Sequence, residues 1–131
     1  MRVLVDTCIW SLALRRIVLG SSHSNTLREL ISENRAYLIG PIRQEILSGI
    51  SHKQQFIKLR NTLEAFPDLM IQTSDYECAA EFSNDLRQKG IQGSAIDFLI
   101  CAIAHRYGMA VYTVDKDFDY FIQHLPIKIY S

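Results

Sequence analysis

Two short apolar runs in this chain end directly at an aspartate. Val3-Leu4-Val5 precedes Asp6, and Val111-Tyr112-Thr113-Val114 precedes Asp115. A mostly β-branched run without polar alternation predicts a strand buried on both faces, which is typical of a parallel sheet covered by helices. Sites in such sheets lie beyond the carboxyl ends of the strands. Both aspartates are therefore expected at the edge of the sheet where a functional site would form.

Helical and strand-like patterns alternate along the rest of the chain. Helices are predicted for residues 7–14, 24–33, 54–65, 74–89 and 95–107, for a segment beginning at Gly40-Pro41, and for a last segment from about residue 118. Strands are predicted for residues 2–5, 36–39, 69–72, 110–114 and 127–130. This order predicts an α/β fold with a mostly parallel central sheet flanked by helices on both faces.

The length of the chain limits its organisation. A chain of 131 residues is long enough for one hydrophobic core and too short for two ordinary domains, so one domain over residues 1–131 is expected. The longest apolar stretch, residues 96–104, is shorter than the roughly 20 residues of a membrane span. We see no pattern of a secretory signal and expect a cytoplasmic protein rather than a membrane protein.

The charges and cysteines exclude several classes of function. Fourteen Lys and Arg residues balance fourteen Asp and Glu residues, so a nucleic acid would have to be bound by a local basic patch. The three cysteines have no C-x-x-C spacing and are expected to be buried free thiols. The four histidines are scattered, and neither a G-x-S-x-G elbow nor a Walker loop is present, which disfavours zinc enzymes, serine hydrolases and nucleoside triphosphatases.

Two further acids interrupt segments that are otherwise predicted to be apolar helices. Glu45 lies about one turn after Gly40-Pro41, and Asp97 lies in the first turn of the helix over residues 95–107. If both converge with Asp6 and Asp115, the four carboxylates need a cation to offset their repulsion.

Each acid also has a purely structural explanation. Asp6 could cap the helix that begins near residue 7, and Glu45 could be a solvated helix residue. Ser94-x-x-Asp97 resembles a capping box. Asp115 could cap the last helix, with Asp117 and Asp119 solvated in its first turn. As a metal ligand we rank Asp115 first in this segment, Asp117 second and Asp119 third.

Four segments, taken in order, resemble the PIN-domain ribonucleases, and most of all the VapC-type toxins of type II toxin–antitoxin systems. They are Val3-Leu4-Val5-Asp6-Thr7-Cys8, Gly40-Pro41-Ile42-Arg43-Gln44-Glu45-Ile46-Leu47, Asp97-Phe98-Leu99-Ile100-Cys101-Ala102 and Tyr112-Thr113-Val114-Asp115-Lys116-Asp117-Phe118. The resemblance implies a parallel sheet between helices, cleavage of RNA and inhibition by a cognate antitoxin protein. It also implies that Asp6, Glu45, Asp97 and Asp115 form a catalytic acidic metal cluster, assisted by Asp117.

The expected cofactor is Mg²⁺, which prefers oxygen ligands and keeps several waters; Mn²⁺ accepts the same ligands. Thr7 matches the small hydroxyl residue that follows the first acid in the family, and by this resemblance it is expected to contact the substrate. Arg43 and Lys116 are the basic residues nearest the acids in sequence, and either could meet a substrate phosphate.

The leading hypothesis is thus a Mg²⁺-dependent endoribonuclease that binds an RNA substrate and an antitoxin, and we expect a homodimer. Apolar residues near residue 10 and over residues 56–66 could form an antitoxin groove, a dimer face or simply core. Two alternatives remain open. One is a PIN-like binding module without catalysis, and the other is an aspartyl-phosphate receiver or phosphotransferase, which also gathers acids around Mg²⁺.

Overall fold

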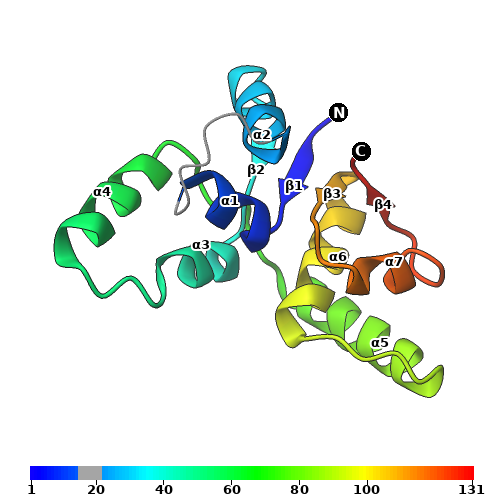
Figure 1. Cartoon of the computed structure of the whole chain (residues 1–131). Coiled ribbons are helices and arrows are strands. Elements are labelled where there is room, and N and C mark those ends of the chain that lie inside the picture. Colours follow the sequence, from blue (N-terminus) through cyan, green and yellow to red (C-terminus); the bar gives the residue numbers. More distant parts are fainter. Residues whose placement is uncertain (15–21) are drawn as a thin grey trace.

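Over the residues that the structure describes, the fold consists of four short strands and the helices that connect them (Figure 1). The computed structural model describes residues 1–14 and 22–131. Within these residues the elements are β1 (Val3–Val5), α1 (Thr7–Leu14), α2 (Ser22–Ser32), β2 (Ala36–Tyr37), α3 (Gly40–Leu47), α4 (Lys53–Leu63), α5 (Thr73–Gln88), α6 (Ala95–Tyr107), β3 (Ala110–Tyr112), α7 (Asp117–Phe121) and β4 (Lys128–Ile129).

The sheet has the strand order β2-β1-β3-β4, and every neighbouring pair is parallel. Val3 pairs with both Ala36 and Ala110, so β1 and β3 occupy the centre. Figure 1 shows α1, α3 and α4 on one side of β1, with α5, α6 and α7 on the other. The predicted α/β fold with a parallel sheet and flanking helices is confirmed. Because all strands run the same way, the residues that follow β1 and β3 emerge at one edge of the sheet.

The apolar elements β1, β3 and α6 form the centre of the hydrophobic core. Every residue of β1 and β3 is buried, and α6 buries an unbroken series of side chains from Phe98 to Ala104. The three cysteines are free, as expected, but the expected burial holds only for Cys101, because Cys8 and Cys78 are partly exposed. Across the described residues, no helix is long and apolar enough to cross a membrane.

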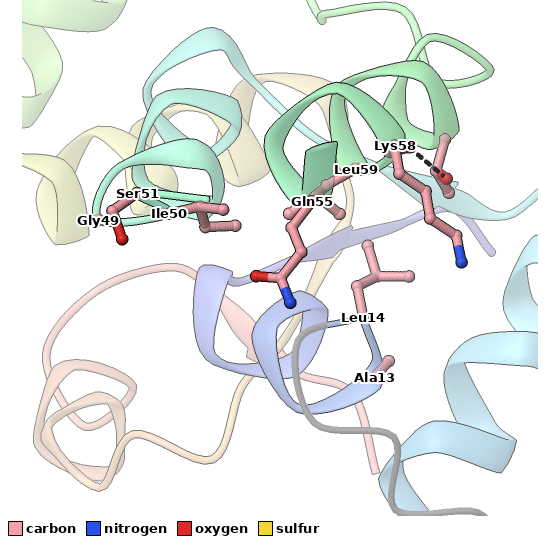
Figure 2. A pocket seen from close by; sticks show the side chains of 9 residues that line it. Ala13, Leu14, Gly49, Ile50, Ser51, Gln55, Lys58 and Leu59 are labelled. Atoms are coloured by element: carbon pink, nitrogen blue, oxygen red, sulfur yellow. Dashed lines mark hydrogen bonds between the residues drawn. The ribbon is translucent and has the colours of Figure 1, made fainter. Parts of the chain in front are cut away.

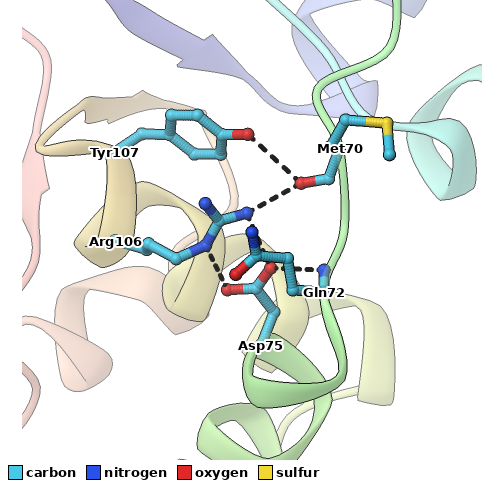
Figure 3. Close-up of polar contacts among 5 residues, drawn as sticks. All are labelled: Met70, Gln72, Asp75, Arg106 and Tyr107. Carbon is cyan, nitrogen blue, oxygen red and sulfur yellow. Dashed lines mark hydrogen bonds and ion pairs between the residues drawn. The ribbon is translucent and has the colours of Figure 1, made fainter.

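The prediction of a strand over residues 69–72 is wrong. The preceding residue, Asp68, forms an isolated bridge with Leu38, in which the Leu69 amide donates to the Leu38 carbonyl at 3.0 Å. The carbonyl of Met70 is bound by two side chains of α6 and not by a neighbouring strand. Met70 O accepts hydrogen bonds from Arg106 Nη2 at 2.8 Å and from Tyr107 Oη at 3.2 Å (Figure 3).

Arg106 joins the end of α6 to the start of α5 (Figure 3). Its Nε and Nη2 donate to the two carboxylate oxygens of Asp75 at 2.7 and 2.9 Å. Asp75 is 2% exposed and also accepts a hydrogen bond from the Gln72 amide at 2.8 Å. Burial by itself would raise the pKa of Asp75, but Arg106 and this amide together hold the pKa below its ordinary value.

Asp75→Asn is expected to lower the free energy of unfolding by roughly 3 kcal/mol at pH 7, because Arg106 loses its partner. The folded-state pKa of Asp75 lies below its unfolded value. The stabilisation is therefore complete above about pH 4 and is lost as the pH falls through the folded-state pKa. Urea denaturation of both proteins at pH 7 and at pH 3 measures this, and their difference should shrink at pH 3.

The matched control removes the exposed ion pair between Glu33 and Arg35, in which the Glu33 side chain is 55% exposed. Glu33→Gln is expected to cost less than about 1 kcal/mol. An equal loss in the two variants would contradict the structural role of Asp75.

Candidate metal and active site

Asp6 lies where β1 ends and α1 begins. Its side chain is almost fully enclosed, with the residue 7% exposed. Oδ1 accepts a hydrogen bond from the Thr7 amide at 2.8 Å, and Oδ2 accepts one from Thr113 Oγ1 at 2.8 Å. The Asp6 carbonyl also accepts from the Ile9 and Trp10 amides at the start of α1. Asp6 thus occupies the position of a helix cap, as expected, while its carboxylate turns toward the loop that follows β3.

Thr113 connects the loop after β3 to the end of β1. Besides donating to Asp6, its hydroxyl oxygen accepts the Asp115 amide at 3.0 Å, and Asp115 Oδ1 in turn accepts the Asp117 amide at 3.0 Å. Sequence reasoning did not single out Thr113 as a site residue. The available signal was a hydroxyl residue two positions before an aspartate, a spacing at which the hydroxyl can bind the backbone amide.

Asp97 lies in the first turn of α6, where the predicted capping box is confirmed. Its amide donates to Ser94 Oγ, and its Oδ2 accepts from the Ser94 amide, both at 3.1 Å. The box uses one carboxylate oxygen, so Oδ1 is left for another partner. The capping and ligand roles of Asp97 are therefore compatible rather than alternative.

The structure brings three of the acids close together. One carboxylate oxygen from each of Asp97, Asp115 and Asp117 lies within 4.8 Å of the others. We call these three residues the acidic cluster. Asp117, ranked second in its segment from sequence, is thus a full member together with Asp115. Asp6 and Glu45 do not belong to this close group of oxygens.

Asp6 and Asp97 are nevertheless coupled electrostatically. Burial raises the pKa of Asp6, the charge of Asp115 raises it further, and hydrogen bonds from Thr113 and Thr7 partly offset the rise. Burial also raises the pKa of Asp97, with the charges of Asp6 and Asp115 adding to the effect. These carboxylates are therefore held where their negative charge is unfavourable unless a cation is near.

Glu45 lies on the exposed side of α3 and contacts the start of α1. Its Oε1 accepts a hydrogen bond from Thr7 Oγ1 at 2.6 Å. Because Thr7 directly follows Asp6, this bond holds α3 against the edge of the sheet where Asp6 lies. The assignment of Glu45 as a ligand and of Thr7 as a substrate contact stays a prediction.

The two basic residues have different surroundings. The Arg43 guanidinium donates to Asp68 Oδ1 at 2.9 Å, to Leu63 O at 3.0 Å and to Phe66 O. These contacts tie α3 to the segment after α4. The expected contact of Arg43 with a substrate phosphate stays a prediction. Lys116 is exposed between Asp115 and Asp117 and remains the basic candidate beside the cluster.

Gly93 permits the close contact that fixes α6 beside α7. A Cβ at this position would lie 2.6 Å from the ζ carbon of Phe121 and 3.0 Å from that of Phe98. The two rings pack against each other with centroids 5.2 Å apart. Both are buried, so neither ring can swing into solvent to make room. The missing side chain of Gly93 therefore helps to set the distance between Asp97 on α6 and Asp117 on α7.

Gly93→Ala is expected to lower the free energy of unfolding by about 1–3 kcal/mol, because the new methyl group overpacks two buried rings. Thermal or urea denaturation measures the change. Gly40→Ala is the control: its Cβ would meet its nearest atom, Asp68 Oδ2, at 4.0 Å. In helix α3 this change should be neutral or stabilise by up to about 1 kcal/mol. Equal effects of both variants would argue against the close contact at Gly93.

The donor set suits a hard divalent cation. The converging groups are carboxylate oxygens, which Mg²⁺ and Mn²⁺ prefer over nitrogen or sulfur. A cation would also relieve the burial and mutual repulsion that raise the pKa values of Asp6 and Asp97.

The fold and the site together define a class: a parallel α/β protein with an acidic oxygen cluster beyond the carboxyl ends of its central strands. The sequence profile of the PIN domain matches residues 3–121, and the chain belongs to this family. It is 32% identical over 121 residues to the VapC ribonuclease Mb1587 of Mycobacterium bovis and to ribonuclease VapC11 of Mycobacterium tuberculosis. In each case 89% of both chains is covered.

Solved structures share the fold at lower identity. FitAcB from Neisseria gonorrhoeae superposes with a TM-score of 0.79 and 19% identity, covering 98% of this chain and 96% of that chain. VapBC2 from Rickettsia felis, bound to a promoter DNA fragment, gives a TM-score of 0.77 and 20% identity, with 98% and 96% covered.

Proposed function

We propose that residues 1–131 form one PIN domain that acts as a Mg²⁺-dependent endoribonuclease, the toxin of a toxin–antitoxin pair. The observation that carries this proposal is the convergence of Asp97, Asp115 and Asp117 beside the buried Asp6. The similar mycobacterial proteins, which are named ribonucleases, support RNA as the substrate.

In this proposal the acidic cluster and Asp6 hold the metal, and Glu45 completes the site from α3. When bound, Mg²⁺ or Mn²⁺ would supply an activated water and neutralise charge that develops during hydrolysis of a phosphodiester. Thr113 holds the Asp6 carboxylate in one orientation through its hydroxyl. Asp97 offers the oxygen that its capping box does not use. Lys116, exposed between two acids, is available to bind a substrate phosphate.

Purified protein is expected to cut RNA with Mg²⁺ or Mn²⁺ and to stop when EDTA is added. Asp97→Asn and Asp117→Asn should each lower the cleavage rate by about 100-fold or more, because removal of a ligand weakens the metal site. Gel assays on a fluorescent single-stranded RNA measure the rates. Asp119→Asn is the matched control within α7, because Asp119 is exposed and lies outside the acidic cluster.

Two results would contradict this proposal. If Asp97→Asn and Asp117→Asn both cleave RNA at the wild-type rate, the assignment of these two residues to the metal site is wrong. Folded protein that cuts no RNA, but takes up phosphate on Asp6 from a small phosphodonor, would favour the receiver alternative instead.

The antitoxin partner is the second part of the proposal. A groove of about 480 Å³ lies between the end of α1, the loop before α4 and α4 itself (Figure 2). Its apolar floor includes Leu14, Ile50 and Leu59, and Lys58 supplies a positive charge. We assign this groove to an antitoxin segment with apolar side chains and an acidic residue opposite Lys58. Solved neighbours that are toxin–antitoxin complexes support such a partner. The homodimer stays a prediction.

A further inference from the structure

Tyr120 is an exposed aromatic residue within one helical turn of the acidic cluster. It lies on α7 and keeps 57% of its surface exposed. Among the described residues, its ring packs against no other ring and its hydroxyl has no hydrogen-bond partner. An aromatic side chain left open beside a charged site offers a flat apolar surface to a ligand.

The geometry of α7 directs Tyr120 toward the site. Asp117 and Tyr120 are three residues apart, so their Cβ atoms lie on neighbouring parts of the helix surface, about 5–6 Å apart. The Cα–Cβ bond in a helix leans toward the N-terminus, which brings the Tyr120 ring back toward the turn of Asp117. Phe118 and Phe121 are fully buried and fix the orientation of α7. Tyr120 therefore stands beside the cluster on a rigidly packed helix.

A second exposed apolar side chain is next to one of the same acids in the sequence. Val114 directly precedes Asp115 and is 41% exposed, although its amide is held by Cys8 Sγ at 3.5 Å. The surroundings of the acidic cluster thus include exposed apolar surface as well as charge. Ribose and phosphate are polar and gain little from apolar surface, whereas the faces of unpaired bases can stack on it.

We propose that Tyr120 contacts the substrate by stacking on an unpaired base of single-stranded RNA, next to the phosphate held at the acidic cluster. This inference rests on the proposed function and adds a base-binding position to it. Carboxylates that no cation neutralises repel the RNA backbone, and the chain has no net positive charge to offset this repulsion. An uncharged stacking contact supplies attraction at this place and tolerates any base, because every base has a π-face.

Tyr120→Ala is expected to weaken RNA binding by about 5- to 150-fold, the range for loss of one base–aromatic stack. The KM for a short RNA should rise more than kcat falls, whereas Tyr120→Phe should restore binding because the ring remains. Tyr76→Ala is the matched control: Tyr76 on α5 is also 57% exposed, but it lies on a different helix and lines a groove with Ala79 and Ile96. If Tyr120→Ala behaves like Tyr76→Ala, the proposal is overturned and Tyr120 becomes a candidate for a protein interface.

A binding measurement separates this proposal from the proposed function. Tyr120→Trp in the otherwise unchanged protein places a fluorescent ring at the site, and Trp10, the one native tryptophan, is fully buried. Added RNA should quench this fluorescence, and the equivalent Tyr76→Trp protein should show no quenching. Quenching without cleavage by the wild-type protein would support stacking and contradict the nuclease. Cleavage with no quenching would support the nuclease and contradict stacking.

Discussion

The hydrogen bond from Thr113 Oγ1 to Asp6 Oδ2 joins the ends of the two central strands. Asp6 is buried at the end of β1, and Thr113 belongs to the loop that carries Asp115 and Asp117 after β3. A buried carboxylate is costly unless it has partners, so this bond both offsets the burial of Asp6 and fixes the loop beside it. The position of the acidic cluster relative to the sheet depends on this connection.

The hydrophobic core fixes the other half of the site. Asp97 lies in the first turn of α6, whose next residues, from Phe98 to Ala104, are all buried. Asp117 lies on α7, which is held by its own buried rings and by the close approach of Gly93. Carboxylates that repel one another thus stay together because the helices that carry them are packed in the core. Such a site is organised before any cation binds, which reduces the free-energy cost of forming it.

The sequence predicted well what depends on local pattern. The apolar runs before Asp6 and Asp115 correctly predicted the central strands, and Ser94-x-x-Asp97 correctly predicted the capping box. Contacts between distant segments were harder to foresee. Residues 69–72 have a strand-like pattern, but Arg106 and Tyr107 donate hydrogen bonds to the Met70 carbonyl. Arg43 was placed near the acids by its position beside Glu45, yet its guanidinium points to the segment after α4.

The same limit applies inside the site. The candidate acids could be identified because each follows a strand or lies near the start of a helix. The sequence did not show that Asp117 belongs to the acidic cluster equally with Asp115. Their equal membership comes from a turn in which Asp115 Oδ1 accepts the Asp117 amide. The role of Gly93 depends on two rings from different helices, and no local pattern carries that information.

In the proposed site, Asp97, Asp115 and Asp117 hold a divalent cation. Anomalous diffraction from crystals grown with Mn²⁺ tests it most directly, because the manganese signal locates the ion independently of the protein atoms. A strong peak is expected within bonding distance of carboxylate oxygens of all three residues, next to Asp6. A peak that contacts none of them, or no peak at a saturating Mn²⁺ concentration, would contradict it.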